Sequence, residues 1–114
     1  MVCGPISTGG AGSLEANIER FNEAIFTLEN LGQKIFNQIP FEKAIGRLHV
    51  PGEDGYDWNI LYHFYEPIFE SGSIRRKFFI PGWESSVGAT WERKQAAQLN
   101  IEVIDLAEDL TPIW

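Results

Sequence analysis

Short apolar runs alternate along this chain with longer segments in which apolar residues recur at helical spacing. The short runs are residues 2–3, 34–38, 77–80 and 101–106. Because a strand that follows a crossover helix returns parallel to the strand before it, the alternation predicts an α/β fold with a parallel sheet and helices on both faces. We expect one domain over residues 1–114, since a chain of this size supports a single core.

The clearest helical segment covers residues 14–31, where apolar side chains are spaced by three and four. Ser13 can cap its beginning and Gly32 can end it. Residues 40–55 read mostly as a connection, with one short helix near residues 41–48. The first helix therefore links the first two expected strands.

Two further helices are expected in the second half of the chain. One begins at Asp57, and Pro67 should kink or stop it. The other begins at Ser85 or Ser86 and runs to about Leu99. Each helix then leads into a short apolar run, as a crossover connection requires.

The net negative charge of the chain limits the kinds of molecule that it can bind. A formal net charge of -7 argues against binding a nucleic-acid polymer, which relies on many cations. Five of the nine cations nevertheless lie in two short stretches, and they are Arg75, Arg76, Lys77, Arg93 and Lys94. They form either a local patch that attracts a single phosphate or a solvated cluster that balances nearby acids.

The expected cellular location follows from features that the sequence lacks. Cys3 is the single cysteine, so no internal disulfide forms, and a cytoplasmic location is expected. No stretch reaches the roughly 18 apolar residues of a membrane span, so no membrane partner is expected. His49 and His63 have no close ligand-type neighbours in the sequence, and we expect no metal.

Two glycine-rich turns follow expected strands, at residues 4–13 and 81–88. In open parallel sheets, ligands bind outside the carboxyl ends of the strands, where both turns would lie. In the first turn, Gly9 and Gly10 let backbone amides approach a ligand, and Ser7 adds a hydroxyl. The turn is either a ligand site or only a tight connection.

Glu92 interrupts a stripe of small and apolar residues on the last helix. By helical spacing it shares this stripe with Gly88, Ala96 and Leu99. An acid in such a place either pairs with a cation or faces a crevice for chemistry. Gly88 lies one turn earlier and leaves room for a substrate. Glu92 is therefore the candidate catalytic residue.

Two motifs resemble the nucleoside 2-deoxyribosyltransferase superfamily. The first is Gly4-Pro5-Ile6-Ser7, followed by a helix that contains Phe21-Asn22-Glu23-Ala24 and Leu31-Gly32. The second is the run IPGWESSVGATWE over residues 80–92, which resembles the Pro-Gly-Trp-x-x-Ser-x-Gly-Ala-x-x-Glu signature of small members of that group. Together they span nearly the whole chain, and the second motif is the more specific.

The resemblance implies a flavodoxin-like (Rossmann-like) parallel sheet of four to five strands and no metal or organic cofactor. The activity it implies is cleavage or transfer at the N-glycosidic bond of a small nucleoside or nucleoside monophosphate. Glu92 matches the family's nucleophilic glutamate, which attacks sugar C1. The residues that match the sugar-lining turn and the loop around the 5′ group are Gly4, Ile6, Ser7, Ser86 and Gly88.

One departure from the family keeps a second interpretation open. Members carry an aspartate at the start of the third strand, where this chain has Arg75 or Arg76, and Asp57 or Glu70 would have to substitute for it. The alternatives are a non-catalytic nucleotide-binding module or a structural subunit. Related proteins complete each other's sites across subunits, so we expect a homodimer or larger assembly.

Overall fold

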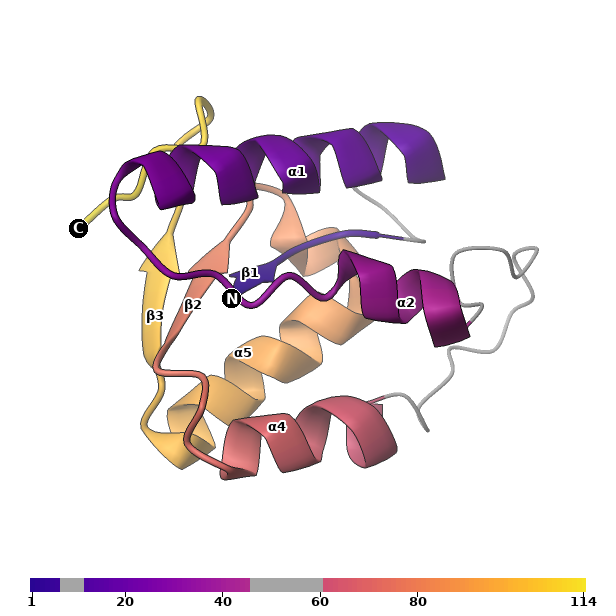
Figure 1. Ribbon diagram of the computed structural model, residues 1–114, viewed down its shortest axis with the longest axis vertical. Coiled ribbons are helices and arrows are strands. Elements are labelled where there is room, and N and C mark those ends of the chain that lie inside the picture. The colour runs from indigo at the N-terminus through magenta and orange to yellow at the C-terminus, as the bar shows by residue number, and fades with distance from the viewer. Residues whose placement is uncertain (7–11, 46–60) are drawn as a thin grey trace.

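The computed structural model describes residues 1–6, 12–45 and 61–114. Over these residues the protein has helices packed around a small parallel sheet (Figure 1). The predicted α/β class is therefore confirmed. No helix in the described ranges is long and apolar enough to cross a membrane.

The sheet consists of β1 (Val2–Cys3), β2 (Arg76–Phe79) and β3 (Glu102–Asp105), with β2 in the centre. Both pairings are parallel. Phe78 of β2 lies opposite Val2 on one side and Ile104 on the other. This register brings the carboxyl ends of β1 and β2 to the same edge of the sheet.

Helices cover both sides of the sheet, as the alternation predicted (Figure 1). Helix α1 (Leu14–Asn30) lies on one side, and α4 (Glu66–Glu70) and α5 (Val87–Leu99) lie on the other. The remaining described helical elements are α2 (Ile39–Ile45), the π-helical turn η2 (Leu61–Tyr65) and the 3₁₀ turn η3 (Trp83–Ser85).

The two long helices begin where the sequence predicts them. Ser13 Oγ accepts a hydrogen bond from the Ala16 amide at 3.1 Å, and Ser86 Oγ accepts one from the Ala89 amide at 3.2 Å. Each serine satisfies an amide that has no partner within its own helix. After α1 the chain reverses at Gly32, which has a φ of +89° that favours glycine.

The strand predicted over residues 34–38 is wrong, because this segment forms no β ladder. Ile35 packs against the core beneath α1, and Phe36 packs against the core on the opposite side. Gln38 bonds to β1 through its side chain, with Nε2 donating to the Val2 carbonyl at 2.7 Å. Two apolar residues in five anchor the segment but do not hold a strand in register. The described sheet therefore has three strands.

Pro67 does not stop the helix that contains it. It lies in the first turn of α4, and the helix continues to Glu70. The π-helical turn η2 directly precedes it, so the proline coincides with a change of helix type. A proline is tolerated in a first turn, because its missing amide would have no helical partner there. The predicted start of this helix at Asp57 lies outside the described residues.

The two sides of the sheet carry separate cores. Successive strand residues point to opposite sides, so Phe78 and Ile80 enter one core and Phe79 enters the other. The α1-side core contains Val2, Ile6, Phe21, Ala24, Ile25, Leu28, Phe78, Ile80, Ile104, Leu106 and Leu110. The α5-side core contains Met1, Cys3, Tyr65, Phe69, Ile74, Phe79, Trp91, Ala96 and Ile101.

Candidate functional site

Glu92 meets the end of β1 although the two are far apart in the sequence. The Cys3 thiol donates a hydrogen bond to Glu92 Oε2, and the Sγ to Oε2 distance is 3.0 Å across 89 residues of sequence. Cys3 directly precedes Gly4, the first residue of the glycine-rich turn. Glu92 is 7% exposed, so its carboxylate is buried beside the end of β1.

Lys77 lies against the same residue from β2. Its side chain is fully buried, and Nζ donates to the main-chain carbonyl of Glu92 at 2.8 Å. The ammonium also sits over the ring of Phe69, with 3.4 Å from Nζ to the ring centroid. A buried cation placed over an aromatic face gains part of the energy it lost on leaving water. Glu92 therefore has contacts from both neighbouring strands.

The five clustered cations of the sequence do not form a single positive patch. Lys77 is buried, Arg76 Nε lies 2.7 Å from a Glu102 carboxylate oxygen, and Arg93 Nη1 lies 2.7 Å from an Asp105 oxygen. Neighbouring residues of a strand point in opposite directions, so a run of cations there cannot form one surface. Three of the five cations are thus engaged separately.

The buried groups around Glu92 shift each other's ionisation. Burial raises the pKa of Cys3 well above its ordinary value of 9.0, and the charge of Glu92 adds to this shift. Burial lowers the pKa of Lys77 below 10.5, against the attraction of Cys3 and Glu92. Burial also lowers the pKa of the Met1 amino group. Cys3 is therefore a neutral thiol near neutral pH, able to donate a hydrogen bond but not to attack.

The described part of the first turn is tightly packed. A Cβ atom on Gly4 would lie 3.0 Å from Ile80 Cβ, so glycine lets this turn approach the end of β2. Ile6 is buried, and its carbonyl accepts a hydrogen bond from Asn17 Nδ2 at 3.0 Å. Both residues therefore have a structural role in this turn that does not depend on a ligand. The other predicted residues of this turn, Ser7, Gly9 and Gly10, lie outside the described residues.

The second predicted loop lies at the start of α5. Ser86 caps the helix, and Gly88 is buried one turn before Glu92. Beside them is a hollow of about 330 Å³ lined by Glu84, Ser85, Ser86, Val87, Thr90, Trp91 and Lys94. Helix amides and an ammonium group together favour an anion. Glu92 is not among the residues that line this hollow.

The residues considered for the place of the family aspartate are exposed where they are described, whereas Glu92 is buried. Glu70 is exposed at the end of α4, which leads into the start of β2. Arg75 is also exposed just before that strand. Both therefore precede the amino end of β2, opposite the edge where the glycine-rich turns begin. Asp57 lies outside the described residues.

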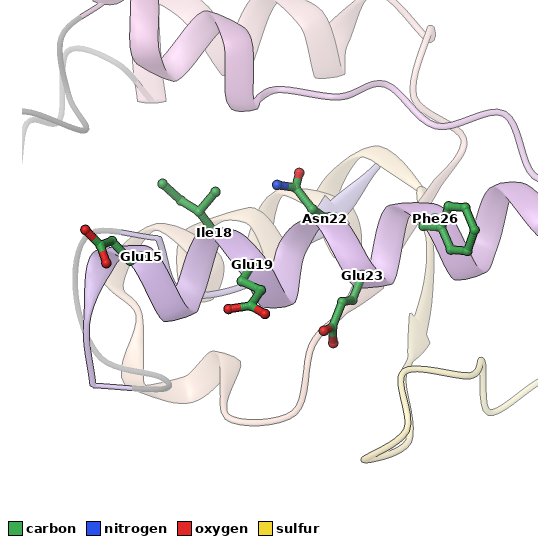
Figure 2. Close-up of a pocket in the computed structure, with 6 residues that line it drawn as sticks. All are labelled: Glu15, Ile18, Glu19, Asn22, Glu23 and Phe26. Atoms are coloured by element: carbon green, nitrogen blue, oxygen red, sulfur yellow. The ribbon is translucent and has the colours of Figure 1, made fainter.

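A larger hollow of about 600 Å³ lies along the outer face of α1 (Figure 2). All of its lining residues belong to this helix, and they are Glu15, Ile18, Glu19, Asn22, Glu23 and Phe26. Three carboxylates in such a surface repel a phosphate, and no predicted site residue lines it. We therefore do not assign the substrate to it. In the described part of the chain, no group of three or more His, Cys, Asp or Glu is placed to hold a metal ion.

Sequence reasoning missed Cys3 and Lys77 as neighbours of Glu92. The signal for Lys77 was its position in the run Lys-Phe-Phe-Ile, because a strand covered on both faces has no solvent side for a lysine. Comparison with known proteins adds no relative: no protein-family model, curated protein or solved structure matches the chain.

Proposed function

We propose that the protein cleaves or transfers the sugar of a small nucleoside or nucleoside monophosphate at its N-glycosidic bond, with Glu92 as the nucleophile. The observation that supports this proposal is the 3.0 Å hydrogen bond from Cys3 to Glu92. It joins the turn that begins at Gly4 to the helix capped by Ser86, and these are the two segments on which the family resemblance rests.

The chemistry needs a carboxylate close to the sugar. Glu92 would attack C1 as the base departs, and the glycosyl-enzyme would then pass the sugar to water or to a second base. The residues that would line the substrate are Gly4, Ile6, Ser7, Gly9, Gly10, Ser86 and Gly88. A flavodoxin-like fold is part of the proposal, and the parallel order β1-β2-β3 is compatible with it. No metal or organic cofactor enters this reaction.

Base release tests the proposal directly. The protein is incubated with a panel of deoxynucleosides, ribonucleosides and their monophosphates, and free base is followed by chromatography. Glu92→Gln keeps the size of the side chain and removes the nucleophile, so release should fall by about a thousandfold or more. The matched control is Glu19→Gln, because Glu19 is exposed on the outer face of α1. Equal release by the wild type and Glu92→Gln would contradict the proposal.

A second candidate function is a nucleotide-binding module without catalysis. It is favoured by the low exposure of Glu92, 7%, and by the separate hollow that Ser86 and Lys94 line. This function predicts that calorimetry detects a nucleoside monophosphate, that Lys94→Met weakens the binding and that Glu92→Gln does not. No base would be released. Binding lost equally in both variants would argue against it.

We also propose that the chain assembles as a homodimer or a larger oligomer. Several large apolar side chains are exposed, including Phe26 at 68%, Ile113 at 60% and Trp114 at 70%. Exposed large apolar side chains of this kind could be covered by a second copy of the chain. Light scattering at micromolar concentration should give a mass of at least two chains, and a monomeric mass would contradict the proposal.

A further inference from the structure

Lys77 is a lysine in the middle of a sheet. It lies on β2, the central strand, and its side chain has an exposure of 0%, whereas Arg76 beside it is exposed. An ammonium group is almost never buried without partners, because leaving water costs more free energy than packing returns. The groups around Lys77 should therefore explain why it is there.

Those groups come from three elements. The Met1 amino group and the Cys3 thiol at the start of the chain interact electrostatically with Lys77, as does Glu92 of α5. Helix α4 contributes the uncharged ring of Phe69 beneath the ammonium. The hydrogen bond from Nζ to the Glu92 carbonyl, 2.8 Å long, is the polar contact that fixes its direction.

Glu92 is consequently fixed at two points. Lys77 bonds its main-chain carbonyl, and Cys3 bonds its Oε2 atom. The first contact fixes this turn of α5 against β2, and the second fixes the carboxylate against β1. Cys3 is a neutral hydrogen-bond donor near neutral pH. Of the two contacts with Glu92, only the one from Lys77 therefore brings a positive charge.

We propose that Lys77 is a positioning residue for Glu92, which it anchors through the main chain while placing a positive charge that favours the ionised carboxylate. This inference rests on the proposed function, because only an attacking Glu92 gives the positioning a catalytic meaning. Lys77 acts through Glu92 and has no contact of its own with the sugar. A purely structural role would place it there equally well, so the test must separate the two.

The central variant is Lys77→Met, which keeps the length of the side chain and removes its charge. Carbon-13 NMR follows the ionisation of the Glu92 carboxyl, assigned by its loss in Glu92→Gln. We expect the midpoint to rise by about one pH unit or more, since the positive charge is gone. In the plot of kcat for base release against pH, the acid limb should shift to higher pH by the same amount. KM should change by less than about twofold.

Two controls separate charge from packing. Lys34→Met removes an exposed cation, and it should leave both the Glu92 midpoint and the kcat profile in place. Lys77→Gln removes the charge but keeps a hydrogen-bond donor on a slightly shorter side chain, so it should show the same rise of the midpoint as Lys77→Met. Agreement between the two Lys77 variants would assign the effect to the charge.

The reciprocal measurement leaves Lys77 intact and serves even if neither Lys77 variant folds. Glu92→Gln removes the negative charge that opposes the lowered pKa of Lys77. The pKa of Lys77, followed by NMR of its side chain, should therefore fall by a further half unit or so.

The outcomes also distinguish this inference from the proposed function. If no base is released by any protein but both titrations shift, the proposed function fails and the electrostatic link between Lys77 and Glu92 stands. If Lys77→Met lowers kcat at every pH without moving the Glu92 midpoint, its role is structural and the inference is overturned. An unchanged Lys77 titration in Glu92→Gln overturns it as well.

Discussion

The two sides of the sheet differ in what they bury. On the α1 side, the buried polar residue Asn17 is a neutral amide that bonds the Ile6 carbonyl. On the α5 side three Lys or Glu residues are buried: Lys77 against Phe69, Glu92 against Cys3, and Glu42, whose carboxylate accepts a 2.5 Å hydrogen bond from Tyr65. A core needs no charges to be stable, and burying such groups costs free energy that their contacts must offset.

This difference divides the molecule into an α1 side with an apolar core and an α5 side with buried Lys and Glu residues. Helix α1 packs against β1 through side chains whose burial does not depend on pH. Helix α5 packs through Trp91 and Ala96 and also through Glu92, whose carboxylate accepts a hydrogen bond from Cys3. The predictions below test whether the two sides behave as differently as their chemistry implies.

The largest effect is expected on the α1 side, from Phe21→Ala. Phe21 has an exposure of 0%, and its removal leaves a cavity, so the free energy of unfolding should fall by about 3–5 kcal/mol. The loss should be the same at about pH 6 and about pH 8, because no ionisable group is involved. Chemical denaturation at both pH values measures it.

The control on the same helix is Phe26→Ala. Phe26 is 68% exposed, and its loss should change the free energy of unfolding by less than about 0.5 kcal/mol. If the loss of unfolding free energy in Phe21→Ala depended strongly on pH, the α1-side core would be coupled to the ionisable groups on the α5 side. That result would contradict the difference between the two sides.

The second prediction concerns Cys3 on the α5 side. Its pKa is raised in the folded protein, chiefly by burial, so the folded state keeps the thiol proton to higher pH than the unfolded state does. The stability this contributes is complete below about pH 9 and is lost as the pH rises toward the folded pKa. The wild type should therefore lose about 1.4 kcal/mol per pH unit in that window relative to Cys3→Ala.

Denaturant titrations of the wild type and Cys3→Ala between about pH 7 and about pH 10 measure this difference. Cys3→Ser serves as the control, because it keeps a hydrogen-bond donor near Glu92 but does not titrate in the same range. It should show the pH dependence of Cys3→Ala. The prediction would be contradicted if the difference in the free energy of unfolding between the wild type and both variants were the same at every pH.

The sequence predicted the starts of the two long helices better than the strands of the sheet. Helices α1 and α5 begin at the serine caps that were expected, because a cap is a local interaction between residues three positions apart. The segment 34–38 failed as a strand, because pairing with β1 depends on contacts that a short run does not encode. Gln38, whose amide bonds Val2 instead, carries no local signal of that role.

The surroundings of Glu92 could be predicted in part. Helical spacing singled out Glu92 as an acid on an apolar stripe, and the structure buries it there. Its neighbours Cys3 and Lys77 were missed, because they come from strands 89 and 15 residues away in the sequence. Lys77 was also grouped with Arg75 and Arg76 as a surface charge. Only the central place of β2 in the sheet turns its side chain inward.

The last prediction compares the two serine caps, one on each side of the sheet. Ser13 of α1 is exposed, whereas Ser86 of α5 is 5% exposed. Water can replace the lost cap in Ser13→Ala, so the cost should be about 0.5 kcal/mol. In Ser86→Ala the Ala89 amide stays buried without its acceptor, and the cost should reach about 1.5–2 kcal/mol. Thermal unfolding of both variants measures the difference, and equal costs would mean that water reaches the start of α5 as freely as it reaches α1.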